Sequence, residues 1–210
     1  MTTDSTLSGV AVLDLTQIMA GPFCTMVLAD MGADVIKVER PNGGDDQRRM
    51  GPPFIKDWSA GFLALNRNKR SLVLDLRSES GPAVFKRLVE DADVVVENFR
   101  PGVMDRLGLG YDVVTMANPQ LVYVKISSQG ATGPEMDYGS LGSTLEQTGG
   151  LASVTGYENG PPLMTNETYP DPVVGIMAFG ALMAALRRRR KTGQGCLVDL
   201  SQREVTTMLL

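Results

Sequence analysis

Strand-like and helix-like segments alternate through the first 130 residues of this 210-residue chain, and this alternation limits the possible folds more than any other feature. Short runs rich in Val, Ile and Leu have the composition of strands that are buried on both faces. Such runs cover residues 9–15, 34–40, 71–76, 93–99 and 121–127. Helical segments follow at 21–33 and 81–91, and a short one lies near 111–117. Strands separated by helices form βαβ units, so the sequence predicts an α/β fold with a Rossmann-like parallel sheet and flanking helices.

The composition changes near residue 128. Residues 129–170 are rich in Gly, Ser, Thr and Pro, which is typical of a loop, and loops on a rigid scaffold often carry functional sites. A long helix is expected at 171–190, a strand at 196–200 and the start of another helix after it. We therefore expect a sheet region over residues 1–130 and a second region over 131–210, which ends inside an incomplete fold.

The chain contains no histidine, and this absence removes several kinds of chemistry. Ser-His-Asp and Cys-His nucleophile systems, HExxH zinc sites and imidazole general bases are all excluded. The two cysteines, Cys24 and Cys196, are too few for a disulfide framework or a cysteine-based metal site, so no metal site is predicted. Catalysis would have to come from carboxylates, Lys, Tyr, backbone dipoles or a bound cofactor.

Charge and hydropathy indicate a cytoplasmic protein that binds neither nucleic acid nor membranes. Twenty Lys and Arg against 24 Asp and Glu give a formal net charge of −4, whereas a general nucleic-acid binder needs a basic surface. The N-terminus lacks the basic and apolar regions of a signal peptide. The apolar run at 173–186 is short for a membrane span and predicts a buried helix.

A dinucleotide site is one interpretation of the first two strands. Glu39 ends the second strand, where a ribose-binding carboxylate would lie. The turn after the first strand, however, has only Gly21 where the G-x-G-x-x-G fingerprint needs three glycines. An NAD-type oxidoreductase therefore stays open as the less favoured alternative.

Basic residues recur at strand ends and turns. Arg40 and Arg100 both follow strands, and the carboxyl ends of parallel strands share one edge, where ligands bind. For any single one of these side chains a solvated surface charge is the better interpretation. Together they favour a polyanionic ligand.

Asp171 stands at the head of the long apolar helix and is followed by Pro172. A structural interpretation is straightforward, because Asp is a favoured N-cap and Pro is favoured at the next position. The same location also stabilises an ionised carboxylate through the helix dipole and free N–H groups. With no histidine present, such a carboxylate beside a glycine-rich loop is the leading candidate for a nucleophile toward an activated acyl group.

Several motifs, in their order and spacing, resemble those of the class III CoA-transferases (the CaiB/BaiF group, which includes formyl-CoA transferases). They are LDLT at 13–16, AGP at 20–22, GADVIKVER at 32–40, NRNKRS at 66–71, ADVVVENFRPG at 92–102, GGL at 149–151, TG at 155–156, GPP at 160–162, DP at 171–172 and KTGQG at 191–195. The loop at 136–142 lacks the histidine of the family's racemase branch, which favours a transferase.

The resemblance implies that residues 1–130 bind CoA and that Asp171 is the nucleophile. It implies that CoA moves from an acyl-CoA to an acceptor carboxylic acid through an aspartyl anhydride and an aspartyl-CoA thioester, with acyl-CoA as substrate and no tightly bound cofactor. By position, the implied CoA contacts are Gln17, Met19, Ala20, Arg40, Lys69, Asn98, Phe99 and Arg106, with Arg100 as a less certain neighbour.

Members of this family are about twice as long as the present chain and form homodimers through their C-terminal halves. The resemblance therefore covers the N-terminal half of a family fold. A non-catalytic CoA-binding fragment stays open as an alternative to an active transferase.

Overall fold

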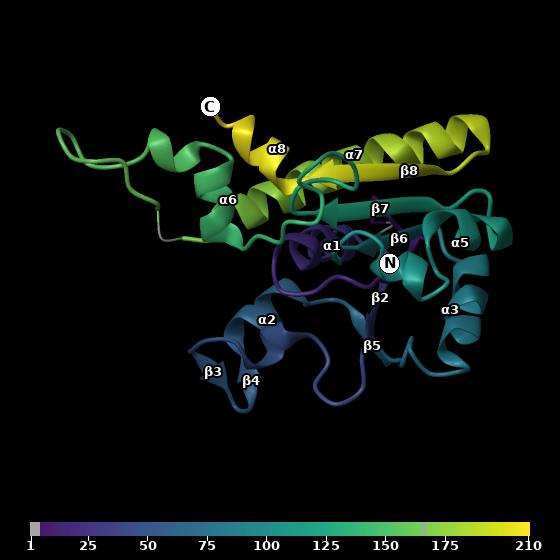
Figure 1. Ribbon diagram of the computed structural model, residues 1–210. Helices are drawn as coiled ribbons and strands as arrows, with labels where there is room; N and C mark the ends of the chain where they lie inside the picture. The colour runs from purple at the N-terminus through teal and green to yellow at the C-terminus, as the bar shows by residue number, and fades with distance from the viewer. Residues whose placement is uncertain (1–4, 166) are drawn as a thin grey trace.

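The computed structural model describes residues 5–165 and 167–210, and its centre is a six-stranded parallel sheet (Figure 1). The strands are β1 (Ala11–Asp14), β2 (Asp34–Glu39), β5 (Arg70–Val73), β6 (Val94–Glu97), β7 (Val122–Ser127) and β8 (Cys196–Ser201). Their spatial order is β5-β2-β1-β6-β7-β8, and every neighbouring pair is parallel. The predicted α/β class with a parallel sheet and flanking helices is confirmed.

Two helices far apart in the sequence cover one face of the sheet. These are α1 (Ala20–Asp30) and α7 (Pro170–Thr192), which lie side by side (Figure 1). Gly175 permits their close approach, because a Cβ at this position would lie 2.9 Å from the Ala20 carbonyl oxygen. Cys24 and Leu28 of α1 share a core with Leu182 of α7 and with the side chains of β6 and β7 that point to this face.

The other face is covered by α3 (Gly81–Glu90) and α5 (Tyr111–Ala117). Phe85 and Val89 of α3 meet Tyr123 of β7 in a second core. The central strands therefore bury both faces, which explains why β6 is an uninterrupted Val-Val-Val-Glu with all four residues buried.

Short elements occupy segments for which the sequence predicted no strand or helix, two of them inside the predicted loop at 129–170. They are η1 (Asp46–Arg49), β3 (Phe54–Ile55), β4 (Trp58–Ser59), α2 (Ala60–Leu65), α4 (Val103–Arg106), α6 (Gly142–Thr148) and η2 (Leu151–Ser153). None is long enough to show two full turns of apolar periodicity, so the pattern that identified the long helices was absent. Figure 1 shows α6 and the segment after it extending away from the sheet.

The last part of the chain returns to the sheet. β8 pairs with β7 along its full length, from Cys196 to Ser201, and α8 (Gln202–Thr207) follows it directly. By length and composition α7 is the one helix in the described part of the chain that could cross a membrane, and here it packs against α1 and β7.

Candidate active site

The strand order reverses direction between β1 and β6, and a crevice opens at the carboxyl ends of these strands. In open parallel sheets this is where ligands bind. Two adjoining cavities form the crevice: the Asp171 cavity, of about 740 Å³, and the Arg40 cavity, of about 510 Å³. Gln17, Phe99 and Arg100 line both, so these three residues lie between the two cavities.

The Asp171 carboxylate lies where the N-termini of α1 and α7 meet. The sequence-based interpretation of Asp171 as the N-cap is wrong, because α7 begins one residue earlier, at Pro170, and Tyr169 occupies the cap position without a side-chain hydrogen bond. Proline is pre-organised for the first helical position, which moves the helix start and leaves the Asp171 carboxylate free of a capping role.

Asp171 is half-buried, and one of its carboxylate oxygens is tightly enclosed. Its Oδ2 atom is buried, and among the residues described it has no hydrogen-bond partner and forms no ion pair with Lys or Arg. Gly142 of α6 makes room for this oxygen, since a Cβ at that position would lie 2.6 Å from it. Burial raises the pKa of Asp171 to about 6, although the backbone N–H groups of Ala20 and of Asp171 itself act in the opposite direction.

The turn after β1 supplies three of the residues that the sequence pointed to. Gln17, Met19 and Ala20 all line the Asp171 cavity. Asn98, after β6, holds this turn by both of its amide atoms: Oδ1 accepts from the Gln17 N–H at 2.7 Å, and Nδ2 donates to the Gln17 carbonyl at 2.8 Å. Phe99 is the next lining residue, and its N–H donates to Glu97 at 2.7 Å.

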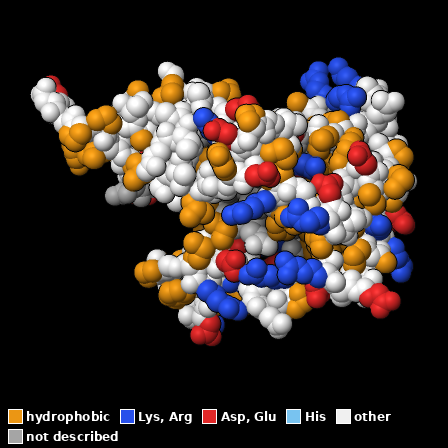
Figure 2. All heavy atoms as spheres, viewed as in Figure 1, with side chains coloured by type: hydrophobic (Ala, Val, Ile, Leu, Met, Phe, Trp, Pro, Cys, Tyr) orange, Lys and Arg blue, Asp and Glu red, His pale blue; other side chains and the backbone are white. Residues whose placement is uncertain are grey.

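The Arg40 cavity gathers arginines from three strand ends. Arg40 follows β2, Arg100 follows β6, and Arg77 comes from the loop after β5. Arg77 was missed by the sequence analysis, because it lies several residues beyond its strand and carries no motif of its own. On the face shown in Figure 2, Lys and Arg side chains gather around a hollow near the middle, although the chain as a whole carries a net charge of −4.

Lys69 does not reach the crevice. Its ammonium group is buried beneath α1, where it donates to Asp14 Oδ2 at 3.0 Å, to Thr25 Oγ1 at 2.8 Å and to Asn66 Oδ1 at 2.9 Å. Burial lowers the pKa of Lys69, and Asp14 opposes that effect. The geometry therefore gives Lys69 a structural environment, and its predicted contact with CoA stays a prediction.

Arg106 also lies outside both cavities. It ends α4, where its backbone N–H donates to the Gly102 carbonyl. Its neighbours Val103 and Leu107 line the Arg40 cavity instead. The structure thus brings together six of the eight predicted CoA contacts and leaves Lys69 and Arg106 apart from them.

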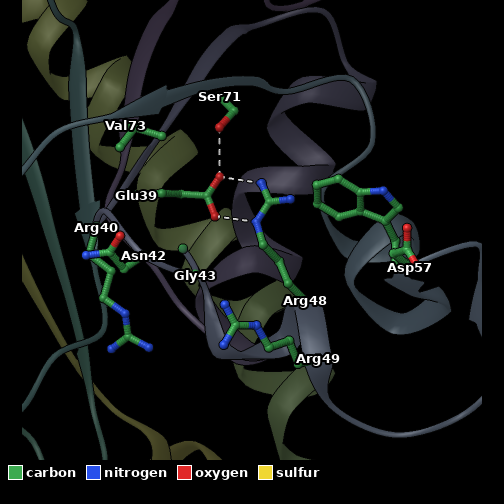
Figure 3. Close-up of a pocket in the computed structure, with 11 residues that line it drawn as sticks. Glu39, Arg40, Asn42, Gly43, Arg48, Arg49, Asp57, Ser71 and Val73 are labelled. Atoms are coloured by element: carbon green, nitrogen blue, oxygen red, sulfur yellow. Dashed lines mark hydrogen bonds and ion pairs between the residues drawn. The ribbon is translucent and has the colours of Figure 1, made fainter.

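A third cavity, of about 520 Å³, adjoins the site behind Arg40 (Figure 3). Its centre is Glu39, which accepts two hydrogen bonds from Arg48, at 2.7 and 2.5 Å, and one from Ser71 at 2.8 Å. The guanidinium of Arg48 also lies over the ring of Phe62, with 3.9 Å to the centroid. Glu39 is therefore occupied by protein groups and is not free to bind a ribose, which is a further observation against a dinucleotide site.

No group of three or more Cys, Asp or Glu side chains in the described part of the chain is arranged to hold a metal ion. The site consists of a half-buried carboxylate with one enclosed oxygen, backbone N–H groups and an arginine-lined extension. The fold and this crevice place the chain among α/β proteins that bind a ligand at the carboxyl edge of a parallel sheet.

Comparison with known proteins identifies the family within this class of α/β proteins. The chain belongs to CoA-transferase family III, whose family model matches residues 7–210. It is 42% identical over 193 residues to the succinyl-CoA:glutarate CoA-transferase of Homo sapiens, covering 92% of this chain and 44% of that protein. It is 41% identical over 203 residues to the acetyl-CoA:oxalate CoA-transferase of Acetobacter aceti, which covers 96% of this chain and 52% of that protein.

A solved structure of similar fold is that of a CAIB/BAIF family protein from Brucella suis. The TM-score is 0.93 at 38% identity, over 98% of this chain and 55% of that one. The present chain therefore spans about half the length of the relatives that it matches.

Proposed function

We propose that this chain forms the CoA-binding, nucleophile-bearing half of a CoA-transferase that moves CoA from an acyl-CoA to an acceptor carboxylic acid. One observation carries the proposal: the Asp171 carboxylate, which has a buried Oδ2 atom and no cationic partner among the described residues, lies in a crevice lined by arginines. The first feature suits a nucleophile, and the second suits a polyanionic ligand such as CoA.

Four displacements complete the proposed reaction. The Asp171 carboxylate attacks the thioester carbonyl, forming a C–O bond and expelling CoA thiolate, which leaves a mixed anhydride. The thiolate attacks the aspartyl carbonyl and releases the donor carboxylate, leaving an aspartyl-CoA thioester. The acceptor carboxylate then displaces the thiolate to form a second anhydride. Finally the thiolate attacks the acceptor carbonyl, which yields the new acyl-CoA and restores Asp171.

The nucleophile in each of these four steps is an anion, so no step requires a general base. A chain without histidine suits that chemistry. With a pKa of about 6, Asp171 is mainly ionised at pH 7, yet it is more basic than an ordinary aspartate. The N–H groups of Ala20 and Asp171 face the charge that moves onto and off the carboxylate.

Trapping with hydroxylamine tests the proposal. Hydroxylamine converts an aspartyl anhydride or thioester into a hydroxamate, which peptide mass spectrometry locates after incubation with a panel of acyl-CoAs. We expect a hydroxamate on Asp171 and none in the Asp171→Asn variant. Asp112→Asn is the matched control, because Asp112 is also the second residue of its helix but is exposed and lies outside the crevice.

The length of the chain favours a second candidate, a CoA-binding half without activity of its own. The relatives are about twice as long, so in this candidate the active site is complete only when further residues join those present here. CoA binding with no hydroxamate on Asp171 would support this candidate, and absence of CoA binding would contradict both. A homodimer and a cytoplasmic location are part of the proposal through the family resemblance and the composition alone.

A further inference from the structure

The turn that leads into α1 is held by side chains from distant parts of the sequence. Asn98 binds both backbone polar atoms of Gln17, as described above. The next N–H, that of Ile18, donates to Asp45 Oδ1 at 3.0 Å. The carbonyl before them, that of Thr16, accepts from Lys37 Nζ at 2.7 Å. This set of contacts fixes the backbone on both sides of Gln17.

Lys37 and Asp45 also contact each other. Their ammonium nitrogen and carboxylate oxygen are 2.9 Å apart, and the side chains are 2% and 1% exposed. A buried ion pair is a poor source of stability, because desolvation offsets most of the attraction, so its presence calls for a conformational explanation.

The backbone of Ile18 supplies that explanation. Its φ is +68°, in the left-handed region that a β-branched residue rarely adopts. Such a conformation persists only where the surroundings hold it in place, and it tends to occur at functional sites. Asp45 binds the N–H of this residue, while Lys37 binds the carbonyl two residues earlier.

The turn has little freedom to move without displacing α1. Two residues after Ile18 the helix begins at Ala20, whose N–H acts on the Asp171 carboxylate. The carbonyl of the same residue is approached closely by Gly175 of α7, so the start of α1 is confined between the turn and α7.

We propose that Lys37 and Asp45 are positioning residues of the active site: their buried pair holds the turn at residues 16–19 so that the N-terminus of α1 stays directed at Asp171. The inference rests on the proposed role of Asp171 as nucleophile. Neither Lys37 nor Asp45 lines the Asp171 cavity, so both act through the turn.

A pH titration by NMR of the 210-residue chain tests this without requiring catalysis. The Ala20 amide signal should follow the ionisation of Asp171, with a midpoint near pH 6 in the unaltered chain. In Asp45→Ala the midpoint should rise by about one pH unit, a tenfold change in the protonation constant, because the ionised form loses a hydrogen-bond donor. The other charged groups that line this cavity, Asp46, Arg100 and Asp137, are the same in both proteins.

Asp93→Ala is the matched control. Asp93 also accepts a backbone N–H, from Ala11 at 2.8 Å, and pairs with Arg189, but at the opposite edge of the sheet. Its removal should leave the Ala20 midpoint unchanged. If Asp45→Ala does not fold, the double variant Lys37→Met, Asp45→Asn removes both charges, keeps an acceptor for the Ile18 N–H, and should shift the midpoint upward by a smaller amount.

Three results would overturn the inference: an Ala20 amide that does not titrate with Asp171, an unchanged midpoint in the folded Asp45 variants, or an equal shift in Asp93→Ala. The hydroxylamine experiment reports separately on the function. A missing hydroxamate together with the expected NMR shifts would contradict activity of this chain on its own and leave the positioning geometry intact.

Discussion

Two carboxylates beside α1, the buried Asp14 and the half-buried Asp171, have opposite surroundings. Asp14 accepts hydrogen bonds from Thr16, Thr25 and Lys69, and its side chain is 0% exposed. Burial alone would raise the pKa of Asp14, but Lys69 and Lys37 hold it at about 2. Asp171 has no such cation among the described residues, and burial raises its pKa to about 6.

This difference separates a structural carboxylate from a reactive one. A carboxylate that is fully paired is stabilised as an anion and is a weak nucleophile, because its lone pairs are already engaged. A carboxylate with an unpartnered buried oxygen is less stable as an anion and more reactive toward an acyl group. Both carboxylates have a buried oxygen, so the presence or absence of a cation decides the role.

The largest expected effect is on stability, in Asp14→Ala. Removing this carboxylate leaves the Lys69 ammonium buried without its charge partner, and breaking a buried pair typically costs about 3–5 kcal/mol. Chemical denaturation at pH 7 should show this loss. Because the folded-state pKa lies below the unfolded one, the contribution of Asp14 is present above pH 4 and fades as the pH falls toward 2. A loss below about 1 kcal/mol would mean that the pair is not structural.

Asp171→Asn should change the free energy of unfolding in the opposite direction and stabilise the folded chain. A carboxyl whose pKa is raised on folding destabilises the folded state once the pH exceeds its unfolded value, since ionisation then opposes folding. The variant should therefore be more stable than the unaltered chain at pH 8, by at most about 3 kcal/mol. The gain should shrink as the pH falls from 6 to 4. Thermal unfolding followed across this range measures it, and a destabilised variant at pH 8 would contradict the comparison.

The contrast between the two carboxylates shows what the sequence can predict. The alternation of strands and helices predicts the parallel sheet, because apolar runs and helical spacing are local patterns that can be recognised in a single sequence. The carboxyl-edge location of Arg40 and Arg100 follows from the sheet alone. Asp171 was identifiable as a candidate from its position at the head of a long helix in a chain without histidine.

The sequence could not predict which residues the buried charged side chains would contact. Lys69 belongs to a motif and was assigned to CoA, whereas the structure buries it against Asp14, 55 positions away in the chain. Arg77 had no motif and lies in the crevice. In each case a tertiary contact decides whether a charge faces a ligand or the core, and such a contact leaves no local pattern. The left-handed Ile18 is similar, because its conformation depends on Asp45 and not on its own preference.

Gly142→Ala tests whether the close approach of Gly142 to Asp171 matters for the reactivity of this carboxylate. The new methyl group would lie 2.6 Å from the Asp171 Oδ2 atom, which must move to relieve the contact. We expect a stability loss of about 1 kcal/mol from overpacking, together with a lower yield of hydroxamate on Asp171. Gly180→Ala in α7 is a suitable control, because a methyl group added there would have no neighbouring atom within 4 Å and alanine favours the helix. Equal hydroxamate yields in the two variants would show that the tight approach is irrelevant to reactivity.

The smallest effect is expected where a carboxylate is paired but exposed. Asp34 binds Arg70 through two hydrogen bonds, at 2.8 and 2.6 Å, yet the two side chains are 56% and 64% exposed. Water screens such a pair, so Asp34→Ala should change the free energy of unfolding by less than about 1 kcal/mol, and less still at high salt. Denaturation in low and high salt, run beside Asp14→Ala, makes the comparison direct. A loss as large as that in Asp14→Ala would mean that pairing alone, without burial, sets the contribution of a carboxylate in this fold.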